Sequence, residues 1–131
     1  MSGLIEVLNK LQAANVRRDK AAILALVTAD VEYHFHVGTP PLIGFEGISK
    51  FLDRYWGMAS ELVWRIDHHA ENGDKLLVEG YEEFVNTKTG QKVAHPYMGI
   101  FEIRDGKIAK WRDYFEKDPP APAAAAAPAA R

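Results

Sequence analysis

Three turn signals divide the second half of the chain into four stretches rich in β-forming residues, and this spacing limits the possible folds severely. The turns are Asn72-Gly73-Asp74, Thr87-Lys88-Thr89-Gly90 and Asp105-Gly106. The stretches between them are typical of strands joined as hairpins, and they cover residues 62–70, 75–86, 92–104 and 108–115. Pro96 predicts a bulge or an edge position in the third stretch, because proline cannot donate to a sheet. We therefore expect an antiparallel sheet.

The first half of the chain predicts three helices, near residues 3–16, 19–28 and 45–56. The third has the clearest helical spacing, with apolar side chains at Ile48, Phe51, Leu52, Tyr55 and Trp56. Residues 31–37 alternate between apolar and polar and predict one short strand between the second and third helices. Helices followed by hairpins indicate an α+β fold. We expect a cone of curved antiparallel sheet against the helices, with a pocket at its mouth.

The chain has 131 residues, which suits one domain. Residues 119–131 contain four of the seven prolines and eight alanines, and such a segment has almost nothing to bury. We therefore predict a domain over residues 1–117 and a mobile Pro/Ala-rich tail over residues 118–131. No internal repeat is visible.

The composition excludes several classes of function. The formal net charge of −2 argues against a non-specific nucleic-acid binder. With no cysteine, the chain has no disulfides, thiolate metal sites or cysteine nucleophile. No apolar run reaches the roughly 20 residues that span a bilayer. No secretory signal is visible either, so we expect a cytoplasmic protein with neither a nucleic-acid nor a membrane partner.

Carboxylates inside otherwise apolar strands are the first candidates for chemistry. Asp113 shares a strand face with Trp111 and Phe115, which indicates either pocket chemistry or a buried ion pair near the rim. Glu82 and Glu83 are adjacent and face opposite sides. Glu82 lies on the more apolar face and is therefore predicted to point inward.

The histidines give weaker evidence. His34 and His36 form an H-x-H pattern that can bind metal from one strand face, but short patterns of this kind are common by chance, and we predict no metal site. His95 alternates with Tyr97, Gly99 and Phe101 and could line a cavity. No P-loop, Rossmann glycine pattern or G-x-S-x-G motif is present.

Three segments together resemble the nuclear-transport-factor-2-like, SnoaL-like superfamily. They are YHFHVGTPPLIG at residues 33–44, GIFEIRDGKI at residues 99–108 and WRDYF at residues 111–115. The resemblance covers about residues 4–117 and implies a cone-shaped α+β fold. It does not fix an activity, because the superfamily includes isomerases, cyclases, dehydratases, hydrolases and binding proteins.

Within the superfamily, the pattern is most similar to the limonene-epoxide-hydrolase type, in which the Asp of WRDYF is catalytic. The resemblance makes Asp113 the catalytic Asp and aligns Glu82 with the second Asp of an R-x-D motif, whose Arg is replaced by Gly80. The family's Tyr falls at Tyr33. Its Asn falls at Phe35, or at His36 with a one-residue shift. The ketosteroid-isomerase type instead has a catalytic Asp on the first strand, where this chain has no carboxylate.

Two hypotheses follow. In the first, the chain is a small-molecule enzyme in which Asp113 and Glu82 form an acid/base pair, Tyr33 adds a hydrogen bond, and no metal or organic cofactor takes part. The substrate would be apolar or aromatic with one oxygen function. The expected pocket walls are Phe35, Trp56, Phe84, His95, Tyr97, Trp111 and Phe115.

In the second hypothesis, the domain binds a small ligand or acts as a dimeric interaction module without catalysis. Both hypotheses include a homodimer. The residues Met98, Ile100 and Tyr114 make the outer face of the sheet more apolar than a solvated face should be, and the resemblance also implies a dimer.

Overall fold

The computed structural model describes residues 3–116. The predicted tail over residues 118–131 lies outside the described residues. The elements in chain order are α1 (Ile5–Arg17), α2 (Lys20–Leu24), β1 (Val27–His34), β2 (Leu42–Ile43), α3 (Gly44–Met58), β3 (Ala59–Asn72), β4 (Lys75–Asn86), β5 (Lys92–Arg104) and β6 (Lys107–Tyr114).

All six strands form one sheet in the order β2-β1-β6-β5-β4-β3. Strands β3 to β6 pair as antiparallel neighbours, as the turn signals predicted. The expectation of a wholly antiparallel sheet is wrong at one pair, because β1 runs parallel to β6, with Tyr33 opposite Trp111. Period-two alternation indicates on which face of a strand each side chain lies. It does not indicate whether two paired strands run parallel or antiparallel. The sequence pattern therefore could not reveal this pairing.

Strands β4 and β5 have the predicted bounds, since they coincide with residues 75–86 and 92–104. Pro96 lies opposite Tyr81 of β4, whereas the pairing of β5 with β6 ends at Met98 and Tyr114. Pro96 therefore has a paired strand on one side only. This is the edge-like position that its missing N–H requires.

The helices differ from the expected ranges at their ends. Helix α2 stops at Leu24, short of residue 28, because Val27 already begins β1 opposite Ile108 of β6. Helix α3 continues through Gly57 to Met58. Between α1 and α2, Arg18 adopts a left-handed conformation with φ of 54°, and Asp19 caps α2 by accepting from the backbone N–H of Ala22.

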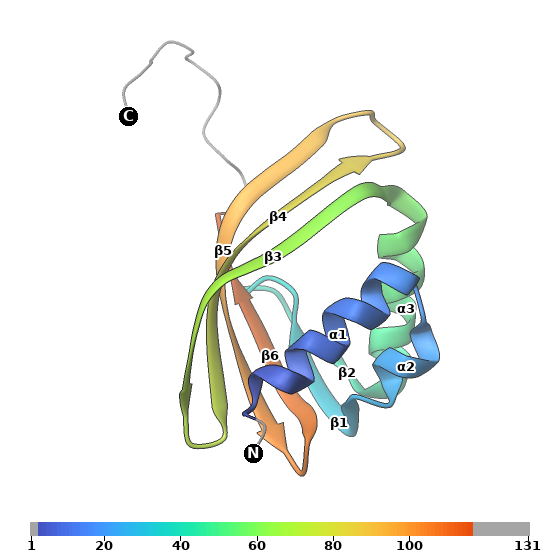
Figure 1. Cartoon of the computed structure of the whole chain (residues 1–131). Coiled ribbons are helices and arrows are strands. Elements are labelled where there is room, and N and C mark those ends of the chain that lie inside the picture. The colour runs from blue at the N-terminus through green and yellow to red at the C-terminus, as the bar shows by residue number, and fades with distance from the viewer. Residues whose placement is uncertain (1–2, 117–131) are drawn as a thin grey trace, which may run out of the picture.

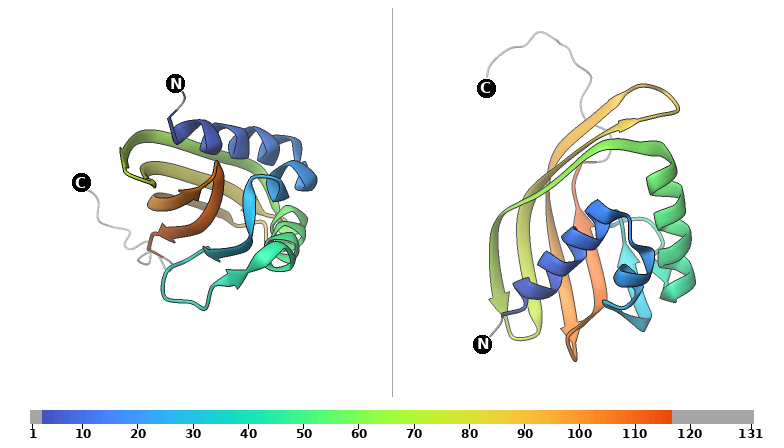
Figure 2. Two further views of the ribbon diagram at one scale, coloured as in Figure 1. Left: turned by 90° about the horizontal axis from the view of Figure 1, so that it is seen from below. Right: turned by 45° about the vertical axis from the view of Figure 1, so that its right-hand side comes forward.

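The sheet curls, and the helices lie on its concave side (Figures 1 and 2). Helix α1 crosses in front of the strands, and α3 stands beside β1 and β2 at the open side of the curve. The most deeply buried side chains come from both layers and include Leu8, Leu11, Ile23, Val31, Ile48, Leu76, Phe101 and Ile108. The predicted α+β cone is thereby confirmed.

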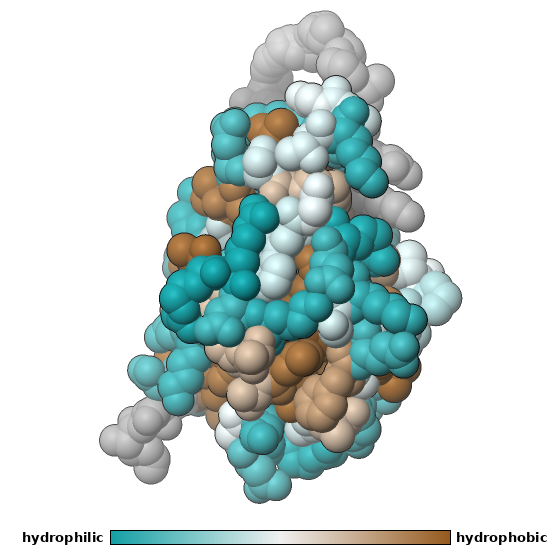
Figure 3. Space-filling model, turned by 90° about the vertical axis from the view of Figure 1, so that its right-hand side faces the viewer, coloured by the Kyte–Doolittle hydropathy of each residue, from teal (hydrophilic) through white to brown (hydrophobic). Residues whose placement is uncertain are grey.

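The side of the molecule that carries α3 is mostly polar on its surface (Figure 3). Apolar side chains gather toward the lower part of that view. Among the helices of residues 3–116, none is long and apolar enough to cross a membrane.

Candidate functional site

A cavity of about 660 Å³ opens between the concave face of the sheet and α3. Strands β1, β4, β5 and β6 contribute one wall, and α3 contributes the facing wall through Phe51 and Tyr55. Apolar and aromatic side chains make up most of the lining. Three carboxyl groups, of Glu82, Asp113 and Glu116, lie among them, and Glu116 is exposed just beyond the end of β6.

Asp113 lies at the end of β6, beside Trp111 and Tyr33. The indole Nε1 of Trp111 donates to its Oδ1 at 3.1 Å, and the hydroxyl of Tyr33 donates to its Oδ2 at 3.3 Å. Burial, and then the negative charge of Glu82, raise the pKa of Asp113 to about 8, although both hydrogen bonds act in the opposite direction. Within residues 3–116, no Lys or Arg forms an ion pair with Asp113.

Glu82 reaches the same cavity from β4. The hydroxyl of Tyr55 donates to its Oε2 at 2.5 Å, and Nε2 of His95 lies 3.6 Å from its Oε1. His95 is the register partner of Glu82 on β5, which explains their proximity. Burial and the charge of Glu82 raise the pKa of Tyr55 far above its ordinary value. Tyr55 therefore remains protonated and keeps donating.

Glu83, the neighbouring carboxylate, lies on the outer face of the sheet. It accepts from the hydroxyl of Tyr81, and its Oε1 lies 3.2 Å from Nζ of Lys92. The hydrogen bonds from Tyr81 and Lys92 are the main reasons why the pKa of Glu83 is lowered. The positive charge of Lys92 lowers it further. Glu82 therefore lies in the cavity, whereas the adjacent Glu83 is paired with Tyr81 and Lys92 on the outer face.

Tyr33 lies on β1, and its ring stacks on that of Trp111 with centroids 4.0 Å apart. Burial, followed by the charges of Asp113 and Glu82, raises the pKa of Tyr33 well above its ordinary value. At neutral pH Tyr33 is therefore a hydrogen-bond donor to Asp113 and not a base.

Most of the predicted wall residues line the cavity, namely Phe35, Phe84, His95, Tyr97, Trp111 and Phe115. Trp56 does not, and this part of the expectation is corrected. Its Nε1 donates to Oδ1 of the buried Asn15 on α1 at 3.0 Å. Consecutive helical residues are rotated by about 100°, so Tyr55 faces the cavity while Trp56 faces α1.

The sequence analysis did not place three aromatic side chains in the wall of this cavity, those of Phe51, Tyr55 and Trp64. Phe51 and Tyr55 were interpreted only as the apolar stripe of a core helix, although aromatic residues four positions apart on that stripe were the available clue. Their rings stack with centroids 5.4 Å apart. Trp64 enters from β3, and its Nε1 donates to the hydroxyl of Tyr97 at 2.5 Å.

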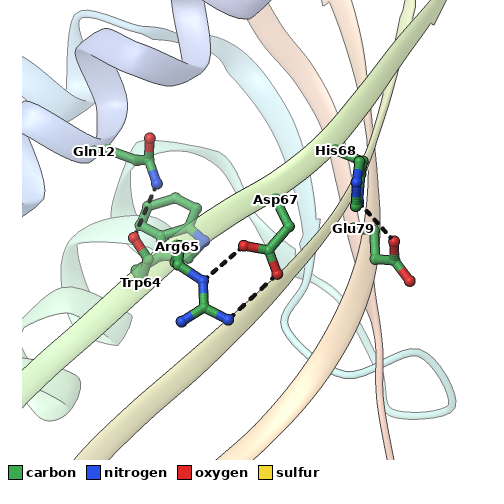
Figure 4. A network of polar contacts seen from close by, with 6 residues as sticks. All are labelled: Gln12, Trp64, Arg65, Asp67, His68 and Glu79. Atoms are coloured by element: carbon green, nitrogen blue, oxygen red, sulfur yellow. Dashed lines mark hydrogen bonds and ion pairs between the residues drawn. The ribbon is translucent and has the colours of Figure 1, made fainter.

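The strand that carries Trp64 is held in place from outside the cavity (Figure 4). Nε2 of Gln12 on α1 donates to the backbone carbonyl of Trp64 at 3.1 Å. Beyond Trp64, Arg65 and Asp67 form an exposed ion pair of 2.6 Å along β3, and Figure 4 shows both pointing away from α1. The Gln12 contact joins the helical layer to the sheet beside the site.

The H-x-H pattern does not form a cluster. His34 lies near Glu32, with Nε2 and Oε1 4.0 Å apart, whereas Nε2 of His36 lies 3.1 Å from the carbonyl oxygen of Phe115. Residues 3–116 contain no group of three or more His, Asp or Glu side chains that could hold a metal ion.

A SnoaL-like domain model matches residues 7–111, and the chain belongs to this family. An epoxide hydrolase of the limonene-epoxide-hydrolase type from M. tuberculosis is similar, with a TM-score of 0.75 and 25% identity over 86% of this chain and 82% of that one. A protein from Catenulispora acidiphila with a ketosteroid-isomerase-like fold has a TM-score of 0.76 and 21% identity over 86% of both chains.

A nuclear-transport-factor-2-like protein of unknown function from Burkholderia pseudomallei has a TM-score of 0.78 and 19% identity. That comparison covers 88% of this chain and 92% of the other. The resemblance inferred from the sequence motifs is thus confirmed at the level of family and fold.

Proposed function

We propose that this protein is a small-molecule enzyme in which Asp113 and Glu82 act as an acid/base pair inside an apolar cavity. One observation carries the proposal. Asp113 is surrounded by aromatic side chains, has no cationic partner among residues 3–116, and has a pKa raised to about 8. A carboxyl group that keeps its proton at neutral pH can serve as a general acid.

Burial, and then the charge of Glu82, raise the pKa of Asp113 and keep the proton on that carboxyl group. In the proposed mechanism, Glu82 takes a proton from a substrate C–H group or from water. Asp113 gives its proton to the substrate oxygen on which negative charge develops. Tyr55 and His95 hold Glu82, and Tyr33 and Trp111 hold Asp113, so both carboxyl groups are oriented before the substrate binds.

The lining supports an apolar or aromatic substrate with one oxygen function. Phe35, Phe51 and Tyr55 form a run of stacked rings along one wall. On the sheet, the ring of Trp64 stacks with that of Trp111, with centroids 6.3 Å apart. Proton transfer between these carboxyl groups and the substrate requires no metal or organic cofactor, and we propose that none takes part.

The test is a screen of epoxides, enones and polyketide-like compounds for thermal stabilisation, followed by turnover assays on the compounds that bind. Asp113→Asn and Glu82→Gln should each lower kcat by about 10²- to 10⁴-fold, the range of general acid–base catalysis, with little change in affinity. Glu83→Gln is the matched control, because Glu83 lies on the outer face, and it should leave kcat unchanged. Full activity of Asp113→Asn would end the proposal.

The second candidate is a non-catalytic ligand-binding module. The observation that favours it is Gly80, which aligns with the Arg of the limonene-epoxide-hydrolase type. A Cβ at this position would lie 2.1 Å from the carbonyl oxygen of Arg65 and 3.1 Å from Cε1 of Tyr97, so β4 has no room there for a side chain. Stabilising ligands without turnover of any would support this candidate.

We also propose that the protein is a homodimer. Met98 and Tyr114 are register partners on the outer face of the sheet, and they are 53% and 48% exposed. Leu77, opposite Ile100, extends this apolar patch and is 38% exposed. A second copy of the chain covering the patch would remove these side chains from water.

A further inference from the structure

Helix α1 contributes one polar side chain to the lining of the cavity, that of Asn15. The other lining residues from α1 and α2 are the buried Leu11 and Ile23. Asn15 is only 9% exposed. A buried amide group is costly unless its oxygen and its two N–H hydrogens find partners. The partners of each atom of this amide therefore decide what it can do.

The orientation of the amide is fixed by Trp56 on α3. Nε1 of Trp56 lies 3.0 Å from the side chain of Asn15. An indole N–H can only donate, so the atom that faces it is the amide oxygen Oδ1. The two hydrogens on Nδ2 are left for other acceptors, and within residues 3–116 no group takes them in a hydrogen bond.

These two hydrogens are open to the cavity. In residues 3–116, the one side-chain nitrogen or oxygen that is both sealed inside the protein and unpaired is Nδ1 of His36. Nδ2 of Asn15 is unpaired as well and is therefore not sealed. Because Asn15 lines the cavity, its amide hydrogens are accessible to a molecule that enters.

The backbone around Asn15 is also anchored to α3. The backbone N–H of Arg18 donates to the carbonyl oxygen of Asn15 at 3.0 Å. The guanidinium of Arg18 donates to the carbonyl oxygens of Trp56 and Ala59 at 2.9 and 3.0 Å. Asn15 is thus held through its side chain and its backbone, and a ligand meets an amide that is already oriented.

Two adjacent residues of α3 orient polar groups in both layers of the cavity. Trp56 donates to Asn15 in the helical layer, and Tyr55 donates to Glu82 in the sheet. One helix therefore fixes the amide and the proposed base at the same time. Pockets for small molecules typically have apolar walls with a few polar groups of this kind, which orient the ligand.

We propose that Nδ2 of Asn15 donates a hydrogen bond to a second oxygen of the ligand, which is then an apolar molecule with two oxygen functions. The first oxygen function lies at Asp113 and Glu82, and the inference rests on the proposed function for that one only. The second is a neutral carbonyl group, because an amide supplies no charge and burying an anion beside it would be costly.

The experiment compares 2,6-diacetylnaphthalene with 2-acetyl-6-isopropenylnaphthalene, in which C=CH₂ replaces one C=O and the shape is kept. Calorimetry gives both dissociation constants, and their ratio is the preference for the second carbonyl group. Asn15→Asp keeps an oxygen for Trp56 and removes the donating NH₂ group. The double variant Asn15→Leu with Trp56→Phe removes both partners and serves if Asn15→Asp does not fold.

Gln12→Met is the matched control, because it removes the other primary amide on α1. Nε2 of Gln12 donates to the backbone carbonyl of Trp64 and does not line the cavity (Figure 4). Its loss can weaken the fold but should affect both compounds equally. Thermal melts establish that each variant is folded before binding is measured.

We expect the preference for the diketone to fall about fivefold to tenfold in both Asn15 variants, the value of one ordinary hydrogen bond. Gln12→Met should keep the wild-type preference. In proton–nitrogen correlation spectra, the NH₂ signals that are missing from Asn15→Asp identify Asn15. These signals should shift when the diketone binds, whereas the NH₂ signals of Gln12 should not.

An unchanged preference in the Asn15 variants, or Asn15 signals that do not shift, would overturn the proposal and leave Asn15 as an anchor for Trp56. Equal wild-type affinity for the two compounds, or no binding of either, would overturn the ligand class. The proposed function fails separately, since it concerns turnover. An Asn15-dependent preference in a protein without turnover would support this inference while the catalytic proposal fails.

Discussion

The hydroxyl of Tyr55 lies 2.5 Å from Oε2 of Glu82 and joins α3 to β4 across the cavity. This bond holds the proposed base in place from the helical layer, while His95 contacts the other oxygen from the sheet. The outer face offers a close parallel, because Tyr81 donates to Glu83 in the same way. The two tyrosine–glutamate pairs differ mainly in what surrounds them.

Tyr55→Phe should lower kcat about tenfold on any substrate that the screen identifies, because a hydrogen bond to a charged group is worth about 1.5–3 kcal/mol and orients the base. Tyr81→Phe removes the equivalent bond outside the cavity and should leave kcat unchanged. Steady-state kinetics of the two variants test this directly. Equal losses in both would show that Tyr55 acts through stability and not through the site.

The pKa of Asp113 makes stability depend on pH. Its pKa is about 8 when folded, against 3.8 ordinarily, so the folded state binds one more proton between these values. The contribution of Asp113 to the free energy of unfolding is therefore largest below pH 4. It decreases as pH rises to 8, with a slope of at most about 1.4 kcal/mol per pH unit. Asp113→Asn should lack this slope.

Urea denaturation of the wild type and of Asp113→Asn at pH 5, 6.5 and 8 measures the difference. The variant should gain stability relative to the wild type at each step upward in pH. Parallel curves for the two proteins would mean that Asp113 ionises normally in the fold.

Gly80→Ala should destabilise the fold by about 1–3 kcal/mol, the cost of overpacking, because the new Cβ would meet the carbonyl oxygen of Arg65. Gly57→Ala is the matched control. Gly57 lies in α3 with open space around it, so this change should stabilise the protein by about 0.5–1 kcal/mol. Thermal melts of both variants measure these changes in stability. An unchanged stability of Gly80→Ala would contradict the tight packing of β4 against β3.

The homodimer should be lost when a charge is placed in its proposed interface. Light scattering of the wild type at micromolar concentration should give twice the chain mass of 14.7 kDa, and Met98→Arg should give the single chain mass. Val16→Arg is the control, because Val16 is 83% exposed on α1 and lies away from this face. A wild-type mass near 14.7 kDa would contradict the proposal.

Turn chemistry explains why so much of the sheet could be predicted. Asn72-Gly73-Asp74 and Asp105-Gly106 are local signals, and Gly73 and Gly106 adopt the positive φ values, 65° and 77°, that such turns need. Strands β4 and β5 followed from them. The parallel pairing of β1 with β6 has no local signal, because it depends on how distant segments meet.

The site was harder to predict for the same reason. Asp113 and Glu82 could be chosen because a carboxylate is conspicuous on an apolar strand face. Tyr55 and Trp56 are adjacent on a helix and equally aromatic, and only the position of α1 decides which of them meets the cavity. The bond from Nε1 of Trp64 to the hydroxyl of Tyr97 likewise joins residues that are 33 positions apart in the chain.

The parallel pairing of β1 with β6 also makes the site depend on contacts between distant parts of the chain. Tyr33 and Asp113 are 80 residues apart, yet they meet across this pair. Contacts of such sequence separation form slowly, because the entropy of closing a long loop opposes them. We therefore expect the cavity to be completed only when β6 takes its place between β1 and β5.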